Sequence, residues 1–445
     1  MQKRLSRIFA LTLGIPMLLA ILVACGSGST GSGSSSGGGS TASSGSTTIK
    51  IGSDLPTSGQ DISNGLPAQD GAQLAVDEAN AKKLLPGYTF QLVPKDDVGS
   101  SGSFDPAVGK KNVTDLIGDA LVSGIVGPFN SSVAKAEMPV ANQAPIALIS
   151  PSNTNQCLTQ EGAAVGCTGP NDLVPTLRPT GKVTYFRIAT TDDHQGAAIS
   201  DYMYQKLNLK KVYILDDTTT YGVGIADVFE KEWKTLGGTV IDHKSVASAT
   251  TYVSLLTTVA ATKPDAIFFG GTNSTGGTLI RQQMQQVQGL QNTPFAGGDG
   301  IQNSGFATGV GLTGGKVYST VAAVNPNILA SAQTFITNFK AKFGADKYGA
   351  YSAGGYDCAN ILLQAIKNAI QGGAKTPKDS NDSAGAQTFR QAVIDAIQKI
   401  NYQGVTGLQT FDANGDTTNK VISIYELAAV KGKPDWKFLD QVIVK

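Results

Sequence analysis

Short polar loops follow several apolar runs of the sequence, and their side chains and backbone could hold a small carboxylate. Residues 127–132 (GPFNSS) come directly after the run 124–126 and just before a helical stretch, and residues 150–155 (SPSNTN) follow the run 147–149. Small hydroxyls and free backbone N–H groups at a helix start suit a carboxylate. An ordinary serine cap is the alternative for the first loop. Similar loops follow later runs, at residues 216–217, 270–274 and 297–300.

Groups that could perform acid–base or nucleophilic catalysis are scarce. The chain has two histidines, His194 and His243, and contains no GxSxG, HExxH or P-loop motif. Residues 309–314 have GxGxxG spacing but precede a strand-like run, which argues against dinucleotide binding. The acidic segment 412–416 lacks the glycine position and the final glutamate of a calcium loop. We therefore expect a binding protein that is not an enzyme and has no cofactor and no metal site.

The N-terminus has the features of a secretory signal. A basic start precedes an apolar stretch from residue 8 to 23, and Leu22-Val23-Ala24-Cys25 looks like a bacterial lipobox, in which the cysteine is lipidated after cleavage. We interpret residues 1–24 as a signal peptide and residues 25–48 as lipidated Cys25 with a flexible Gly/Ser tether. A plain transmembrane anchor is the alternative, but the run is shorter than the ~20 apolar residues that a span needs. These features predict an extracytoplasmic protein held at the cell membrane by its lipid.

Two of the remaining cysteines could form a disulfide. Cys157 and Cys167 lie ten residues apart in a loop-like stretch rich in Gly, Thr and Pro. In an oxidising compartment they are candidates for a bond, and two free thiols are the alternative. Cys358 lies among apolar residues and is expected to be buried.

Charge is balanced along the chain. Lys and Arg number 35 against 34 Asp and Glu, and no basic patch is evident. The sequence therefore offers no electrostatic footprint for nucleic acid.

Strand-like and helix-like segments alternate from residue 48 onward. The strand-like runs are residues 49–52, 90–93, 124–126, 145–149, 185–189, 211–215, 265–269 and 315–324, with amphipathic stretches between them. Alternation of this kind predicts an α/β fold with doubly wound parallel sheets. A chain of 445 residues exceeds the size at which one core stops growing, so two lobes are expected.

Five segments of the body carry a family resemblance. They read IGSDLPTSGQDISNGLPAQDGAQLAVDEAN, IVGPFNSSVA, PIALISPSNTN, YGVGIADVFEKEWK and TGLQTFDANGD. In this order they resemble the branched-chain amino-acid (Leu/Ile/Val) binding proteins of ABC importers, which have the periplasmic binding protein type I fold. The resemblance implies two Rossmann-like lobes, joined by a hinge of three crossing strands, that close around a ligand. It places residues 49–188 and 320–404 in the N-terminal lobe and residues 189–319 and 405–445 in the C-terminal lobe.

The resemblance also implies a ligand site. Ser131 and Thr154, with the backbone near Ser152 and Asn153, would hold the ligand carboxylate. Asp299 would bind the α-ammonium from the facing lobe. The other implied pocket residues are Tyr221, Thr272 and Tyr356.

Some positions depart from the family pattern. Asn64 stands where the family often has an aromatic residue, and Thr272-Asn273 where it often has Tyr. The segment 156–180 is longer than usual and could cap the cleft. An amide or urea-like ligand therefore stays open beside a branched-chain amino acid.

The resemblance implies an importer subunit that delivers its solute to a membrane permease, and we expect it to be a monomer. A receptor domain that senses a ligand is the alternative function.

Overall fold

The computed structural model describes residues 46–443, which belong to one compact unit. The predicted lipid site Cys25 and nearly all of the predicted tether lie outside the described residues. Within residues 46–443, no helix combines the length and the apolar character needed to cross a membrane.

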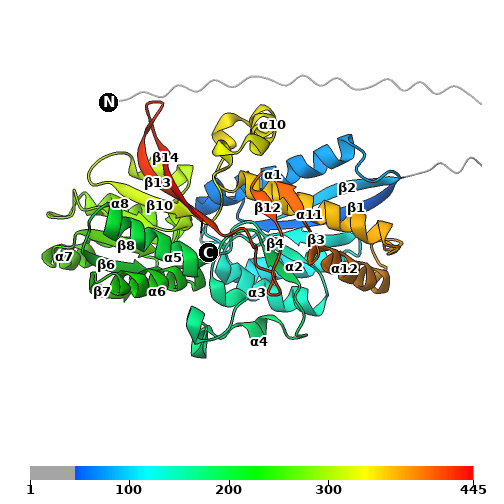
Figure 1. Cartoon of the computed structure of the whole chain (residues 1–445), viewed down its shortest axis with the longest axis horizontal. Helices are drawn as coiled ribbons and strands as arrows, with labels where there is room; N and C mark the ends of the chain where they lie inside the picture. Colours follow the sequence, from blue (N-terminus) through cyan, green and yellow to red (C-terminus); the bar gives the residue numbers. More distant parts are fainter. Residues whose placement is uncertain (1–45, 444–445) are drawn as a thin grey trace, which may run out of the picture. The chain divides into compact units, whose positions relative to one another are not determined.

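The first lobe is built on a five-stranded parallel sheet. Its strands, in spatial order, are β2 (Tyr88–Asp96), β1 (Thr47–Leu55), β3 (Val122–Val126), β4 (Leu148–Ser150) and β5 (Tyr185–Arg187). One face packs on α1 (Ile62–Ala81), α11 (Ser352–Gln371) and α12 (Ser383–Ile397), and the other on α2 (Pro106–Gly118), α3 (Ser131–Gln143) and the short α4 (Val174–Leu177). Further elements of this lobe are α10 (Gln333–Phe343), β11 (Tyr402–Gly404) and β12 (Gly407–Gln409) (Figure 1).

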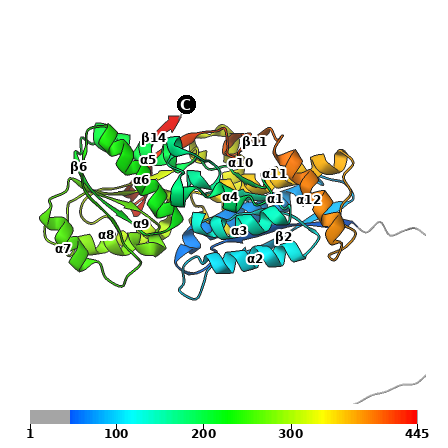
Figure 2. The same cartoon turned by 90° about the horizontal axis from the view of Figure 1, so that it is seen from below.

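The second lobe is built on a seven-stranded mixed sheet. Its strands, in spatial order, are β14 (Lys433–Ile443), β13 (Val421–Val430), β10 (Val317–Val321), β9 (Phe295–Gly297), β8 (Ala266–Gly270), β6 (Lys211–Asp216) and β7 (Thr239–Ser245). One face packs on α7 (Val253–Ala261), α8 (Thr278–Met284) and α9 (Ser304–Val310), and the other on α5 (Asp192–Asp201) and α6 (Thr220–Thr235). Figure 2 shows these helices beside the strands of this lobe. The predicted α/β class with two doubly wound lobes is confirmed, although β13 and β14 add an antiparallel edge.

The residue pattern explains both the sheets and their helices. In β6, Val212 and Ile214 enter one core and Tyr213 and Leu215 enter the opposite one, so the strand is apolar throughout. Asp105 caps α2 as expected, because its Oδ1 accepts a hydrogen bond of 2.8 Å from the N–H of Ala107.

The chain crosses between the two sheets three times within residues 46–443: after β5, after β10 and before β13. Hydrogen bonds join the three crossing segments. The N–H of Thr190 donates to the carbonyl of Ala322 at 2.8 Å, and Thr190 Oγ1 accepts from the N–H of Val421 at 3.0 Å. These segments form the hinge between the lobes.

Two of the predicted lobe boundaries need correction. Residue 320 lies inside β10, which pairs with β9 and β13, so the second lobe continues through Val321. Phe411 packs on Phe186 with ring centroids 5.1 Å apart, and Val405 joins a core of the first lobe. The first lobe therefore extends beyond residue 404, because its core needs these apolar side chains.

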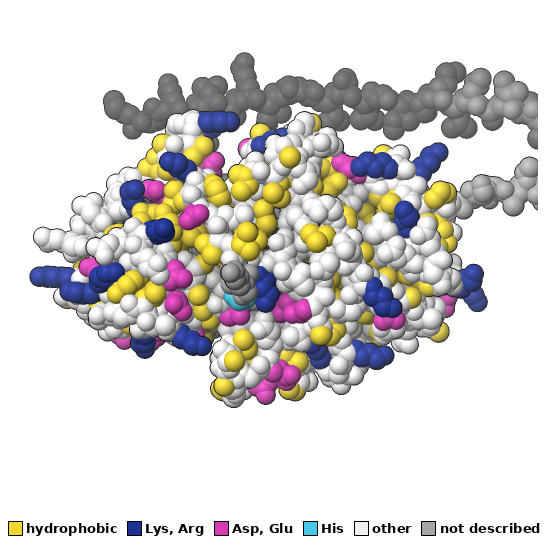
Figure 3. All heavy atoms as spheres, viewed as in Figure 1, with side chains coloured by type: hydrophobic (Ala, Val, Ile, Leu, Met, Phe, Trp, Pro, Cys, Tyr) yellow, Lys and Arg dark blue, Asp and Glu magenta, His cyan; other side chains and the backbone are white. Residues whose placement is uncertain are grey.

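Charged side chains of both signs are interspersed over the face shown in Figure 3. This distribution agrees with the balanced composition of 35 basic and 34 acidic residues. On this face there is no broad basic surface of the kind that binds nucleic acid.

Candidate functional site

A small cavity lies where the strands of the two sheets end. Its volume is about 20 Å³, close to the space that one water needs, so a solute can enter only when the lobes separate. The loops that follow parallel strands form its walls, as expected for open α/β sheets. The lining residues are Phe129, Asn130, Ser131, Ser152 and Thr154 from the first lobe and Tyr221, Thr272, Asp299 and Gly300 from the second.

The first lobe presents hydrogen-bond donors to the cavity. Ser131 is the first residue of α3, so free backbone N–H groups of that helix start here. The hydroxyl of Thr154 is buried and has no hydrogen-bond partner among residues 46–443. These two residues can therefore donate to a ligand carboxylate.

Ser152 and Asn153 hold the loop rather than offer free side chains. The hydroxyl of Ser152 donates to the carbonyl of Phe129 at 2.8 Å. The side-chain amide of Asn153 donates to the same carbonyl at 2.6 Å, and its Oδ1 accepts from the hydroxyl of Tyr185 at 2.8 Å. Ser152 lines the cavity, whereas the side chain of Asn153 fixes the loop from behind.

Asp299 places a carboxylate on the second-lobe wall. Its Oδ1 accepts from Gln195 Nε2 at 2.7 Å and from the Tyr221 hydroxyl at 2.9 Å. Its Oδ2 accepts from the hydroxyl of Tyr351, a first-lobe residue, at 2.6 Å. Burial raises the pKa of Asp299, and these three hydrogen bonds offset part of the rise. A carboxylate has about four acceptor positions, so room for one more donor remains.

Tyr356, implied by the resemblance as a pocket residue, lies elsewhere. Its hydroxyl donates to Glu78 Oε2 at 3.0 Å, and its ring packs on Phe335 with centroids 4.6 Å apart. The tyrosine that reaches Asp299 is Tyr351, the residue just before α11. The resemblance implied Tyr356, inside α11, whereas the tyrosine that contacts the site is five residues earlier, at the start of the same helix.

Asp192 is a buried carboxylate that the sequence reasoning missed. It is the first residue of α5, and its side chain is fully buried. In the described part of the chain no donor reaches either carboxylate oxygen with hydrogen-bonding geometry, although the Thr154 hydroxyl lies near enough to oppose the rise in the pKa of Asp192. The N–H of Asp192 donates to the carbonyl of Thr154 at 2.7 Å. Burial raises the pKa of Asp192 well above its ordinary range, and the charge of Asp299 raises it further. Asp192 is separated from the end of β5 by residues 188–191, so a search for polar residues directly after a strand does not select it.

Polar contacts join the lobes on both sides of the cavity. On one side, Asn64 Nδ2 donates to Asn273 Oδ1 at 3.2 Å and Ser63 Oγ donates to Asn303 Oδ1 at 3.1 Å. On the other, the N–H of Thr220 donates to Ser132 Oγ at 3.1 Å. The structure is therefore a closed arrangement of the two lobes.

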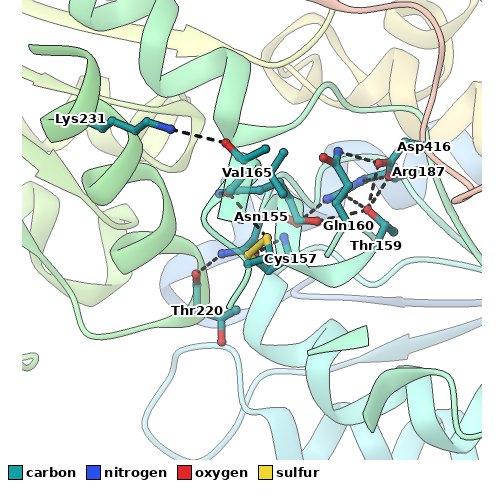
Figure 4. Close-up of a disulfide and its surroundings, with 12 residues drawn as sticks. Asn155, Cys157, Thr159, Gln160, Val165, Arg187, Thr220, Lys231 and Asp416 are labelled. Atoms are coloured by element: carbon teal, nitrogen blue, oxygen red, sulfur yellow. Dashed lines mark hydrogen bonds and ion pairs between the residues drawn. A yellow bond between two sulfur atoms is a disulfide. The ribbon is translucent and has the colours of Figure 1, made fainter. Parts of the chain in front are cut away.

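The segment with Cys157 and Cys167 lies at the edge of the cleft. The two cysteines form a disulfide, and Asn155 Nδ2 beside them donates to the carbonyl of Thr220 in the other lobe at 2.7 Å (Figure 4). Lys231 Nζ of the second lobe also reaches the carbonyl of Ala164, at 3.5 Å. An open groove of about 560 Å³ separates this segment from α6, so the segment borders the cleft without filling it.

Chemically, the cavity has hydrogen-bond donors on its first-lobe wall and the carboxylate of Asp299 on its second-lobe wall. Hydrogen bonds to charged groups are strongest where water is excluded. The arrangement suits a molecule that carries a carboxylate and an ammonium a short distance apart.

Comparisons with known proteins agree with the fold. A Leu/Ile/Val-binding protein of Rhizobium johnstonii is 28% identical over 388 residues, which cover 86% of this chain and 92% of that protein. The isoleucine complex of a branched-chain amino acid transporter substrate-binding protein from Streptococcus pneumoniae is 27% identical, with a TM-score of 0.67 and coverage of 89% and 99%. A solute-binding protein from Rhodopseudomonas palustris, in complex with 3,4-dihydroxybenzoic acid, is 20% identical, with a TM-score of 0.68 and coverage of 89% and 97%.

One protein-family model matches nearly all of the chain that the structure describes. The family described as periplasmic binding protein matches residues 48–433. This range contains the hinge, every residue that lines the cavity and both lobes except β14, of which it reaches only the first residue. The chain therefore belongs to the periplasmic binding protein family.

Proposed function

We propose that the protein is the solute-binding subunit of an ABC importer and that it captures an α-amino acid between its two lobes. The observation that carries the proposal is the buried carboxylate of Asp299 on the second-lobe wall of the cavity, facing the donors of Ser131 and Thr154 on the first-lobe wall. In this proposal the protein works outside the cytoplasmic membrane, with a lipid on Cys25, and delivers its ligand to a membrane permease.

The two ends of the cavity support a zwitterion over a simple acid. An α-carboxylate would accept hydrogen bonds from Thr154 and from the start of α3, where the helix dipole favours negative charge. An α-ammonium would neutralise Asp299, whose burial without a cation is unfavourable. An aromatic acid has no cationic group, so Asp299 would lose this partner.

Closure gives the ligand contacts to both lobes at once. Ser131 and Thr154 belong to the first lobe, and Asp299 belongs to the second, so one amino acid bridges them. A ligand that contacts both lobes shifts the equilibrium toward the closed arrangement. The three crossing segments around Thr190 provide the hinge for this motion.

A thermal-shift screen followed by calorimetry tests the proposal. We expect at least one L-amino acid to stabilise the protein, whereas benzoate and 3,4-dihydroxybenzoate leave the melting temperature unchanged. A ligand present at 100 times its Kd adds about 2.7 kcal/mol of stability, which such a screen detects. Stabilisation by the benzoates and by none of the amino acids would overturn the proposal.

A variant of Asp299 then locates the site. Asp299→Ala should weaken amino-acid binding by about 2–5 kcal/mol, the range for truncating one partner of a buried charge pair. Asp193→Asn, one residue beyond Asp192 and partly exposed, is the matched control and should bind like the unaltered protein. The lipid anchor is tested separately, since a Cys25→Ser variant should leave the membrane fraction.

A further inference from the structure

Asp61 lies in the cleft with one carboxylate oxygen unused. Its side chain is buried, with 1% exposure, although it belongs to the first lobe and faces the second. Oδ2 accepts a hydrogen bond of 2.6 Å from the hydroxyl of Ser274 across the cleft. Oδ1 is buried and no donor among the described residues reaches it with hydrogen-bonding geometry, although the Phe104 N–H and the Asn64 amide lie near enough to oppose the rise in the pKa of Asp61. A buried acceptor without a donor is costly, so this oxygen marks a position where a donor would be stabilising.

A chain of hydroxyls connects Asp61 to the ligand cavity. Thr272 lines the cavity, and its Oγ1 lies 3.0 Å from Ser274 Oγ. Ser274 in turn donates to Asp61. Asp61 is therefore two hydrogen bonds beyond the cavity wall, on the side where Thr272 stands.

The cleft around Asp61 is polar and has no basic side chain in its lining. Asn64 and Asn303 both donate to Asn273 Oδ1, at 3.2 and 3.0 Å. Asp217 of the second lobe lies near enough for its charge to act on Asp61. Neither the cavity nor the adjoining groove of about 740 Å³ is lined by Lys, Arg or His. An apolar side chain placed here would bring no donor to Asp61 Oδ1.

We propose that Asp61 is a specificity-determining residue and that the bound amino acid has a side chain ending in hydrogen-bond donors. Carboxamide, ureido, guanidinium and ammonium groups share this chemistry. The inference rests on the proposed amino-acid site and adds the class of side chain. When the cleft opens, Ser274 separates from Asp61, and on closure the distal N–H groups of the ligand bind the carboxylate that Ser274 alone cannot satisfy.

The affinity difference between ligands with and without a side-chain donor should be large, because a site built to bind a polar group discriminates strongly against analogues that lack it. An analogue that lacks the donor leaves the buried carboxylate unpaired, which lowers affinity far more than the loss of one methylene does. Norleucine is the informative analogue, since its unbranched side chain fills similar space and carries no donor.

Calorimetry on the intact mature protein tests the inference with five ligands. L-Glutamine and L-citrulline carry neutral donors, L-arginine carries a charged one, and L-leucine and L-norleucine carry none. We expect the best donor-bearing ligand to bind at least tenfold more tightly than norleucine. If arginine binds best, attraction to the negative charge of Asp61 is the main source of side-chain recognition. If glutamine or citrulline binds best, hydrogen bonds to the Asp61 carboxylate are the main source.

The variant Asp61→Ala should reduce affinity for the best donor-bearing ligand at least tenfold and leave norleucine binding unchanged. Asp105→Asn removes a charge from the same lobe while keeping a competent helix cap, so it serves as the matched control. It should leave the order of affinities for the five ligands unchanged.

Two results would overturn the inference. One is leucine or norleucine binding as tightly as the donor-bearing ligands in the unaltered protein, a result that needs no variant to fold. The other is an equal loss for all five ligands in Asp61→Ala. Either leaves the amino-acid site standing, whereas an absence of binding by every amino acid would refute the proposed function itself.

Discussion

The protein contains two buried clusters of charged side chains, one around Arg187 and Asp416 and the other around Asp54, Asp97 and Glu137. In the first cluster, Arg187 Nε donates to Asp416 Oδ1 at 2.7 Å, and both side chains are almost completely buried. In the second, all three carboxyl groups are fully buried and no cation pairs with them among residues 46–443. The two clusters therefore compensate buried charge by different means.

The first cluster is fully hydrogen-bonded. Arg187 also donates to the carbonyl of Asn155 at 2.7 Å and to the hydroxyl of Thr159. Gln160 Nε2 donates to Asp416 Oδ2 at 3.0 Å. Burial alone would raise the pKa of Asp416, but the Arg187 guanidinium holds it below its usual range. Figure 4 shows this cluster beside the disulfide segment that it anchors.

In the second cluster, protons take the place of a cation. Burial raises the pKa of Asp54 to about 6, and it raises that of Glu137 well above its ordinary range, with the charge of Asp54 adding to the rise. Glu137 Oε1 and Asp54 Oδ2 both point at Gly109, where a Cβ would meet them at 2.8 and 3.3 Å. No group of three or more such side chains in the described residues is arranged to hold a metal ion.

The difference shows that an unpaired buried carboxylate does not by itself identify a ligand site. Glu137 lies inside one lobe, on α3. Asp192 and Asp61 lie where the lobes meet, so separation of the lobes would expose them to solvent and to a ligand. Position in the cleft, rather than burial, therefore distinguishes these two residues from Glu137.

The largest expected effect comes from breaking the paired cluster. Arg187→Met leaves the Asp416 carboxylate buried without its cation and should lower the free energy of unfolding by about 3–5 kcal/mol. Urea denaturation at pH 7, followed by circular dichroism, measures the loss. The double variant Arg187→Met/Asp416→Leu should recover much of it, because removing both charges removes the unpaired group.

The same cluster predicts a pH effect of defined sign. Asp416 has a lower pKa when folded than its ordinary value of 3.8, so its stabilising contribution is present above pH 4 and is lost as the pH falls below it. The double variant should lack this component of acid denaturation. A single variant as stable as the unaltered protein would show that the pair contributes nothing.

The sequence predicts the strands well and these two clusters poorly, for physical reasons. Apolar runs such as β6 are local signals, and the loops after them bring Ser131, Thr154, Tyr221, Thr272 and Asp299 to one cavity. Arg187 and Asp416 are 229 residues apart, so only the folded chain brings them together. Tyr351 was missed for a related reason, because its role depends on closure against Asp299 of the other lobe.

The second effect concerns the disulfide that borders the paired cluster. Replacing Cys157 and Cys167 by Ala should lower the free energy of unfolding by about 2–3 kcal/mol, since the bond closes a loop across ten positions. The loss should be smaller than for Arg187→Met if the ion pair is the principal anchor of the segment. Reduction of the unaltered protein should reproduce the loss, and unfolding of a Cys358→Ala variant should respond to reduction in the same way. Equal stability with and without the bond would mean that the ion pair alone holds the segment.

The smallest effect has the opposite sign and tests the unpaired cluster. Glu137→Gln removes a carboxyl group whose pKa burial raises well above its ordinary range. It should raise the free energy of unfolding at pH 7.5 by about 1–2 kcal/mol, the order of the cost of one unsatisfied buried polar group. The pKa of Glu137 is higher in the folded than in the unfolded chain, so the folded state binds more protons and stability falls as the pH rises above about 4.5. The gain from Glu137→Gln should therefore shrink to nothing near pH 4, where Glu137 is protonated in both states.

Glu161→Gln, an exposed position, is the matched control and should leave the free energy of unfolding unchanged at both pH values. A destabilised Glu137→Gln at pH 7.5 would mean that Glu137 is ionised and stabilised by its surroundings, and the contrast with the Arg187 cluster would then disappear.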